Sequence, residues 1–172
     1  MASTDLKQVL ALPDPLPSFK WVAETIPNIL GQAQPRNFKD YVEAVDLPFN
    51  NVKIADNWYG GAGYTYYPGT HDISSFAVTF YEDMNGTSLK YIMAWKALVK
   101  DFNSGIYNLP TVFKKDLVLL LQDIKNTPVV RVTMQGIWPA DTGNLNLNYT
   151  DSGRITISQT FSCDGQSIEP LK

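Results

Sequence analysis

The sequence predicts a mainly β protein, an antiparallel β-sandwich or barrel with one flanking α-helix. About seven or eight short segments alternate apolar and polar residues between Gly- and Pro-rich turns, and one segment has helical periodicity. The chain has 172 residues, 44 % hydrophobic and 18 % charged, which suits one domain with a buried core. We see no internal repeat and no second domain.

The first half of the chain contains four predicted strands after an N-terminal arm. Residues 1–17 are expected to form that arm, because three prolines in its last five positions disfavour both helix and sheet. Alternation of apolar and polar residues predicts strands over 19–26, 37–47, 52–59 and 73–81. In the fourth of these strands Phe76, Val78 and Phe80 are expected to face one way.

An aromatic and glycine-rich segment, residues 58–70, follows the third strand, and we expect it to be a long loop. Its rings need a partner surface, so we favour a protein–protein contact over a sugar-stacking platform. The glycines at 60, 61 and 63 match neither the dinucleotide fingerprint nor a phosphate loop. The predicted contact residues are Trp58, Tyr59, Tyr64, Tyr66 and Tyr67.

One helix is predicted over residues 88–102. Tyr91, Trp95, Leu98 and Phe102 follow one another at helical spacing and form an apolar stripe. Residues 85–88 supply candidate N-caps.

The last third of the chain is predicted to be all strand. The run LVLLL favours a strand over 116–124 that is buried on both faces, and β-branched residues favour another over 129–137. Residues 145–149 and 154–163 alternate around a predicted hairpin turn at 150–153. In the final strand Ile155, Ile157, Phe161 and Cys163 face the core, and the opposite face is short and hydroxylated: Arg154, Thr156, Ser158, Thr160 and Ser162.

Composition argues against several classes of protein. A net charge of −3 disfavours binding of nucleic acid through phosphate neutralisation. One cysteine and one histidine exclude an internal disulfide and leave little for metal chemistry. No signal peptide and no membrane-length apolar run is visible, so the sequons at Asn85 and Asn148 are read as accidental and the cytoplasm as the site of synthesis.

Two catalytic arrangements can be drawn from the sequence, and we favour neither. Asp141–Gly143 spells the aspartic protease tripeptide, but one copy would need a symmetric dimer, and it follows Pro139 rather than an apolar strand. Cys163 and His71 form a conceivable nucleophile and base, although Cys163 is in phase with the core. We expect no catalysis, no metal and no cofactor.

The segment Gly136-Ile137-Trp138-Pro139 resembles a hallmark of the tail tube proteins of contractile-tailed, T-even-like phages. In that family a Gly-apolar-Trp-Pro turn precedes a glycine, here Gly143, and an alternating hairpin, here with Leu145, Leu147 and Tyr149. The closing strand ITISQTFSCD, which ends at Asp164, the pair Leu47-Pro48 and the helix with Trp95 also fit the family. The resemblance covers roughly residues 19–165.

The resemblance implies a structural protein of the virion tail, assembled in the host cytoplasm. Such proteins form a β-sandwich, and strands of six subunits join into a large barrel; the hexameric rings stack into a tube inside the sheath. Genome and tape-measure protein pass through, and baseplate and terminator proteins bound the tube. A baseplate or tube-initiator protein, or a type VI or bacteriocin tube component, is the nearest alternative.

Several assignments follow for particular residues. The aromatic segment is placed at a subunit or ring contact, and Thr156, Ser158 and Thr160 are our hypothesis for the channel lining. The domain is expected over 18–165, followed by a tail over 166–172 without a counterpart in the family. Gln159 interrupts the apolar face of the last strand and suggests a β-bulge or a local polar contact.

Overall fold

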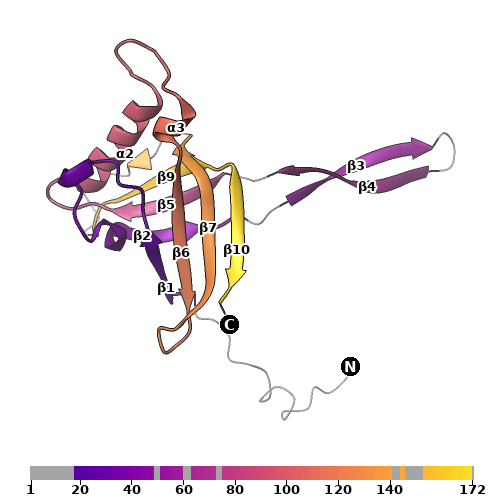
Figure 1. Ribbon diagram of the computed structural model, residues 1–172, viewed down its shortest axis with the longest axis horizontal. Coiled ribbons are helices and arrows are strands. Elements are labelled where there is room, and N and C mark those ends of the chain that lie inside the picture. The colour runs from indigo at the N-terminus through magenta and orange to yellow at the C-terminus, as the bar shows by residue number, and fades with distance from the viewer. Residues whose placement is uncertain are drawn as a thin grey trace.

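Eight strands of the computed structural model form one antiparallel sheet, which bends around the core so that its two halves cross (Figure 1). The structure describes residues 18–48, 51–59, 63–72, 75–140, 144–145 and 153–171, with side chains for 18–48, 75–140 and 153–171. The predicted arm, residues 1–17, lies outside the described residues.

One half, which we name sheet A, has the strand order β1-β6-β7-β10. Its strands are β1 (Trp21–Thr25), β6 (Lys115–Gln122), β7 (Pro128–Pro139) and β10 (Gly165–Pro170). The other half, sheet B, has the order β2-β5-β9-β8 and joins sheet A where the end of β7 pairs with β9. Its strands are β2 (Val42–Asp46), β5 (Phe76–Tyr81), β8 (Asn144–Leu145) and β9 (Thr156–Ser162).

Two further strands form a separate two-stranded sheet, which we name the ribbon. It consists of β3 (Asn51–Tyr59) and β4 (Gly63–Asp72) and extends away from the body in Figure 1. The ribbon prolongs the β2–β5 pair, because β2 leads into β3 and β4 leads into β5. Residues 58–70, predicted to be a long loop, are therefore mostly strand; their glycines and Pro68 suggested a loop, but an isolated hairpin tolerates both.

The helix α2 (Thr87–Val99) packs its buried face against both halves of the sheet. Tyr91 and Trp95 are almost fully buried, and the Trp95 indole N–H donates to the Phe113 carbonyl at 2.7 Å. Phe113 ends α3 (Pro110–Phe113), and two short 3-10 helices, η1 (Gly31–Ala33) and η2 (Phe38–Tyr41), precede β2. Phe102 does not continue the stripe, since the helix ends at Val99 and the Phe102 side chain is 63 % exposed.

The core lies between the two halves of the sheet and α2. Aromatic rings dominate its centre: Trp95 lies 5.2 Å from Phe161, and Tyr91 lies 4.4 Å from Phe38, measured between ring centroids. Phe76, Val78 and Phe80 of β5 all face this core, as their alternation predicts. The antiparallel β architecture with one main helix is thus confirmed.

Three local predictions are wrong, and one of the two alternatives for Gln159 is confirmed. The segment 37–47 begins with η2 rather than strand, and only its second half is β2. In β6, Leu117 and Leu119 are buried whereas Val118 and Leu120 are only partly buried, so one face is covered rather than both. Of the two alternatives for Gln159, the bulge is absent, since β9 keeps its register with β5, and the local polar contact is present, since the buried side-chain amide donates to the Thr160 carbonyl at 2.7 Å. Residues 165–170 are not a tail but strand β10, paired with β7.

Candidate assembly surface

The outward face of sheet B carries mostly small side chains on β5 and β9, with the Tyr81 ring opposite Thr156 and Asp46 of β2 opposite Ala77 at its borders. In the β5–β9 pair, Thr79 lies opposite Ser158 and Ala77 opposite Thr160. These positions alternate with buried ones, so they lie on the face turned away from the core. Ser158 is exposed, and Thr156 and Thr160 are half-buried. The predicted hydroxyl face of β9 therefore exists in the fold.

A charge pair marks one end of this face. Arg154 precedes β9 and donates to Glu43 of β2 at 2.9 Å, and its guanidinium lies 5.5 Å from the centre of the Tyr81 ring. Arg154 is thereby held by a carboxylate and an aromatic ring at the rim of the face. No lysine or arginine lies within the described part of β2, β5 or β9 itself.

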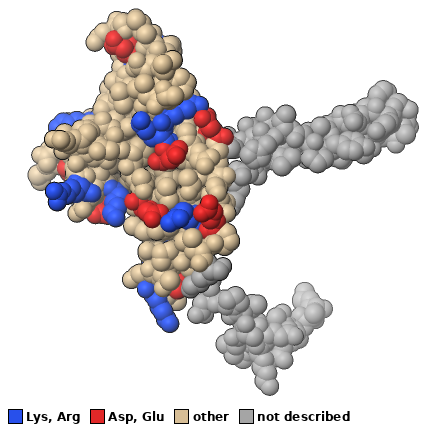
Figure 2. Space-filling view, in the orientation of Figure 1, with Lys and Arg blue, Asp and Glu red and all other residues tan. Residues whose placement is uncertain are grey.

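The opposite surface of the body, the outward face of sheet A, is charged instead. Arg131 of β7 pairs with Glu24 of β1, with the Nε atom 3.3 Å from the carboxylate, and Glu169 of β10 lies opposite Arg131 in the register. Figure 2, which shows this side, has acidic and basic groups interspersed across it. The two outward faces thus differ in chemistry: on sheet B the strands β5 and β9 carry no charge and the acidic residues lie on β2, whereas sheet A carries charges of both signs on β1, β7 and β10.

Both halves of the sheet end in strands that pair on one side within the described residues. Sheet B ends at β2 and β8, and sheet A at β1 and β10. The edges β1 and β2 border a groove of about 540 Å³ that is lined by residues of both strands, including Trp21 and Glu43, and by Lys39 of η2. Edge strands carry a row of unpaired N–H and C=O groups and are sites for pairing with another chain.

The predicted contact residues lie on the ribbon. Trp58 of β3 pairs with Tyr64 of β4, and Asp56 pairs with Tyr66. Tyr59 ends β3, and Tyr67 lies opposite Ala55. Their side chains lie outside the described atoms, so the contact itself stays a prediction; the structure adds that the five positions share one hairpin.

The motif residues form a junction between β6, β7 and β10. Gly136 has a positive φ of 62°, and its N–H donates to Asp116 at 2.9 Å. Asp164 lies directly over it and accepts two hydrogen bonds from the Lys114 ammonium, both at 2.7 Å. A glycine is needed at position 136 because both the backbone conformation and the space require it.

Trp138 and Pro139 are the end of β7, not a turn. Pro139 is the last residue of the strand and lies opposite Phe161. The Trp138 ring packs edge-on against Phe113, with centroids 6.0 Å apart. Trp138 also lines a groove of about 420 Å³ beside the loop that follows α2. Gly143 lies outside the described residues.

Two acidic residues that sequence reasoning missed begin the main helix. Asp83 accepts hydrogen bonds from the Thr87 N–H and hydroxyl at 3.0 and 2.8 Å and from the Tyr41 hydroxyl at 3.0 Å. Glu82 accepts from the N–H groups of Ser88 and Leu89. The predicted N-cap range includes Gly86, which has no side chain to cap with. The carboxylates of Glu82 and Asp83, just upstream, accept the hydrogen bonds of the first backbone N–H groups of the helix instead.

These contacts shift the pKa values of two groups. The hydrogen bond from the Thr87 N–H, with those from the Thr87 and Tyr41 hydroxyls, lowers the pKa of Asp83 to about 2. The hydrogen bond that the Tyr41 hydroxyl donates to Asp83 raises the pKa of Tyr41. The ionised form of Asp83 is therefore part of the folded helix terminus.

The residues weighed for catalysis do not form a described site. Cys163 is buried, and burial raises the pKa of its thiol, which disfavours the reactive thiolate. His71 lies on β4 of the ribbon, and residues 141–143 lie outside the described residues. Among the described residues no cluster of His, Cys, Asp and Glu is placed to hold a metal. None of the described helices is long and apolar enough to cross a membrane.

Comparison with known proteins gives matches of structure but not of sequence. No family model and no curated protein matches the chain. The sheath/tube terminator of an extracellular contractile injection system, PVC, superposes with a TM-score of 0.66 and 15 % identity over 92 % of this chain and 99 % of that one. A chain of the PVC sheath–tube complex gives 0.64 and 15 % over 98 % and 100 %. The tube-terminating cap of the anti-feeding prophage gives 0.67 and 15 % over 94 % and 95 %.

These likenesses establish the fold. The chain has the fold found in the tube, terminator and cap components of contractile injection systems, and a baseplate chain of the anti-feeding prophage also shares it, with a TM-score of 0.61. The predicted fold class, antiparallel β of the tail tube type, is thereby confirmed.

Proposed function

We propose that this chain is a ring-forming structural subunit of the inner tube of a contractile tail or tail-like injection system. It acts without catalysis and without a cofactor. The observation that carries the proposal is the outward face of sheet B. Its β5 and β9 strands present mostly hydroxyl and methyl side chains and no cation, with Tyr81 and Asp46 at the borders, and the face ends in two edge strands that another copy can pair with. The fold that the chain shares with tube, cap and baseplate components supports it.

Edge-to-edge pairing of sheet B between copies would account for the two edge strands and for the uncharged side chains of β5 and β9 between them. If β2 of one copy pairs beside β8 of the next, the sheets join into a closed barrel that leaves no unpaired edge. Rotation between identical copies closes such a heterologous contact into a ring. The outward face of sheet B then lines the channel, with Thr156, Ser158 and Thr160 along one strand of each copy, and the charged face of sheet A turns outward. Six copies per ring is the number that we propose.

The chemistry of the face suits passage of a polyanion. DNA is held where lysines and arginines displace its counterions, and a channel of hydroxyls provides no such sites. Arg154 at the rim is already paired with Glu43. We propose that genome and tape-measure protein pass along this channel, and that the outward face meets the sheath.

The projecting ribbon supplies a second contact. Aromatic residues on an isolated hairpin are suited to anchoring against a neighbouring chain. We propose that Trp58 and Tyr64, with their neighbours on the ribbon, join subunits or successive rings. Baseplate and terminator proteins would then meet the two ends of the tube.

Electron microscopy of the purified full chain, after size-exclusion chromatography, tests the proposal. Stacked rings or long hollow tubes are the expected result for the main tube subunit. Single rings that do not stack would identify a baseplate, initiator or terminator component instead. A monomer at all concentrations would contradict the proposal.

A further inference from the structure

The turn between β5 and α2 contains the one Asn-Gly pair of the sequence, Asn85-Gly86. The side-chain amide of an asparagine is open to attack by the peptide nitrogen of the next residue, because the two groups are held close enough to close a five-membered ring. A glycine in the next position leaves that nitrogen unshielded by any side chain. The pair is therefore a candidate site of chemical change in the chain.

The structure leaves the reacting groups of this pair accessible. The Asn85 side chain is exposed, and no residue in the described part of the chain is hydrogen-bonded to its amide. Gly86 has a φ of 67°, and a Cβ built on it would meet nothing within 4 Å. The Gly86 N–H donates to the Asp83 carbonyl at 3.1 Å, and opening this hydrogen bond frees the nitrogen for attack.

A cation is bound to the carbonyl of the same peptide group. The Lys90 ammonium donates to the Asn85 carbonyl oxygen at 2.6 Å, a short, charge-assisted hydrogen bond. Lys90 lies in the first turn of α2, where side chains point back toward the beginning of the helix. The nitrogen attacks after it has lost its proton, and the negative charge is then shared with the Asn85 oxygen. An ammonium on that oxygen stabilises the charge, as the donors of an oxyanion hole do.

We infer that Asn85 is a site of spontaneous deamidation and that Lys90 assists the closure of the ring. Solvent hydroxide removes the Gly86 amide proton, and the nitrogen forms a bond to the side-chain carbonyl carbon of Asn85. The bond from that carbon to the side-chain nitrogen breaks, and the nitrogen leaves as ammonia with a proton from water. Water then opens the ring at either carbonyl, which gives aspartate or isoaspartate. The net reaction consumes one water, releases one ammonia and transfers no electrons.

Asn103 provides a comparison within the same chain. It is exposed, and its N–H donates to the Asp101 carboxylate at 2.9 Å, as the Asn85 N–H donates to the Asp83 carboxylate at 3.0 Å. A serine follows Asn103, so its neighbouring peptide nitrogen is shielded by a side chain. The two asparagines thus share a local turn but differ in the residue that follows.

Either product would disturb the beginning of α2. One carboxylate oxygen of Asp83 accepts the N–H groups of both Asn85 and Thr87, each at 3.0 Å. Isoaspartate adds one carbon to the main chain between these two donors, so both cannot keep their present positions. Aspartate places a further negative charge beside Asp83. Both products therefore weaken the hydrogen bonds that begin the helix.

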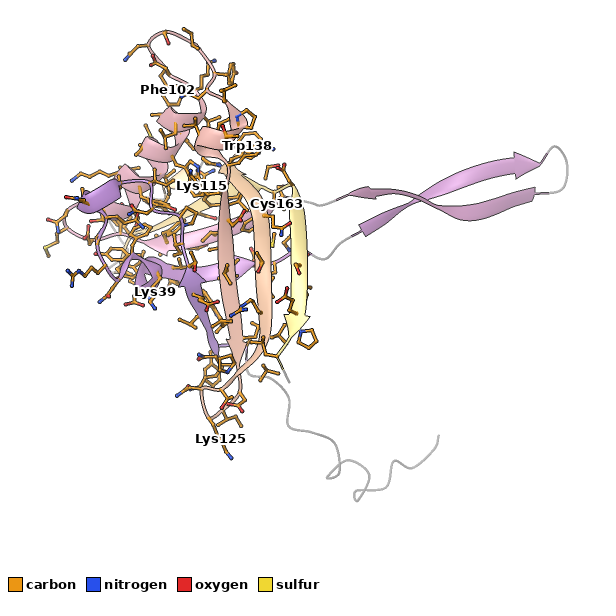
Figure 3. All side chains as sticks on the ribbon, in the orientation of Figure 1. Lys39, Phe102, Lys115, Lys125, Trp138 and Cys163 are labelled. Carbon is orange, nitrogen blue, oxygen red and sulfur yellow. The ribbon has the colours of Figure 1, made fainter. Side chains whose placement is uncertain are left out.

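Storage of the purified full chain at neutral pH and physiological temperature, followed by peptide mapping with mass spectrometry, tests the inference. Asn85 should be converted well ahead of Asn103, and fragmentation by electron transfer should detect isoaspartate beside aspartate. Lys90→Gln removes the charge-assisted hydrogen bond and should slow the conversion of Asn85 roughly tenfold. Lys125→Gln is the matched control, because it removes the same charge from the turn that Figure 3 shows at the lower end of the body, and it should leave the rate unchanged.

The unfolding temperature provides a second measurement. Stored wild-type chain should unfold at a temperature about 2–4 °C below that of fresh chain, because the contacts that begin α2 are weakened. Asn85→Gln has a side chain that closes the corresponding ring far less readily, so its unfolding temperature should not fall on storage. An equal fall in both chains would overturn the assignment of the change to Asn85.

Storage in urea separates the contribution of the fold from that of the sequence. Lys90 is not held at the Asn85 carbonyl in the unfolded chain, so the wild type and Lys90→Gln should be converted at equal rates there. Equal rates in the folded state, or a difference that persists in urea, would overturn the assistance by Lys90. Conversion of Asn85 in urea alone would overturn the site itself. None of these outcomes bears on the proposed ring, since the reaction needs only the folded chain.

Discussion

Gly136 and Asp164 fit together so closely that the position opposite the Asp164 carboxylate has room only for a hydrogen atom. A Cβ built on Gly136 would lie 2.5 Å from the Oδ2 atom of Asp164 and 2.9 Å from its Cγ. The carboxylate cannot simply turn away, because Lys114 holds both of its oxygens at 2.7 Å. Two residues far apart in the sequence thus fix the junction of β6, β7 and β10.

The first prediction concerns this junction. Gly136→Ala should lower the free energy of unfolding by about 2–4 kcal/mol, because it combines a positive φ with a steric clash. Gly105→Ala is the matched control: Gly105 has a similar φ of 72° but nothing within 4 Å of a built Cβ, so only about 1 kcal/mol should be lost. Urea denaturation measures both. Equal losses would show that Asp164 readily gives way.

The second prediction concerns acid stability. The pKa of Asp83 is lowered in the folded state to about 2 from an ordinary value near 3.8, so its ionised form stabilises the fold above pH 3.8. That contribution should disappear as the pH falls from about 4 to 2. Asp83→Asn should therefore lower the unfolding temperature at pH 7 and flatten its dependence on pH in this range.

Asp40→Asn is the control for the acid prediction, since Asp40 is an exposed carboxylate on η2, whereas the hydrogen bonds from Thr87 and Tyr41 go to Asp83. It should leave the slope between pH 4 and 2 as in the wild type. An Asp83→Asn variant with an unchanged acid slope would show that the helix terminus does not depend on this carboxylate.

The third prediction concerns the channel. Thr156→Lys with Ser158→Lys places two cations on the outward face of sheet B, repeated in every copy of a ring. Assembled variant rings should retain double-stranded DNA at low salt and release it as salt rises, and genome delivery should slow. Retention is measured by filter binding over a salt series.

Thr133→Lys with Gln135→Lys is the matched control for the channel prediction, because both residues lie on the outward face of sheet A. The same added charge on the outside should not trap DNA within the tube. Equal retention by the two variants would place sheet B elsewhere than at the channel.

The fourth prediction concerns the ribbon. Because β3 and β4 form a sheet of their own, Trp58→Ser with Tyr64→Ser should leave the unfolding temperature of the body unchanged. Stacking of rings should fail, so electron micrographs should show fewer and shorter tubes. Tubes of normal number and length from this variant would show that Trp58 and Tyr64 do not join the rings.

Periodicity within a segment predicted the parts of the fold that depend on local order. Tyr91 and Trp95, the alternation of β5, and the two faces of β9 were all readable because one face of each element is buried. The helical spacing wrongly included Phe102, because the helix ends at Val99 and residue spacing does not predict where a helix ends.

Features that depend on pairing between distant segments could not be predicted in the same way. Strand β10 is short, polar and ends in a proline, and only its pairing with β7 makes it a strand. The ribbon strand β4 contains glycines and Pro68, which signal a loop when read alone. Residues 103–109 carry no helical or strand period, so the exposure of Ile106, Tyr107 and Leu109 was not visible from the sequence.

The most direct test of the central claim is a reconstruction by cryo-electron microscopy of the assembled wild-type chain. It should show a closed ring in which β9 faces the channel, with Ser158 on the inner wall and Arg131 on the outer surface. A ring with Arg131 toward the channel, or an assembly without a channel, would contradict the account.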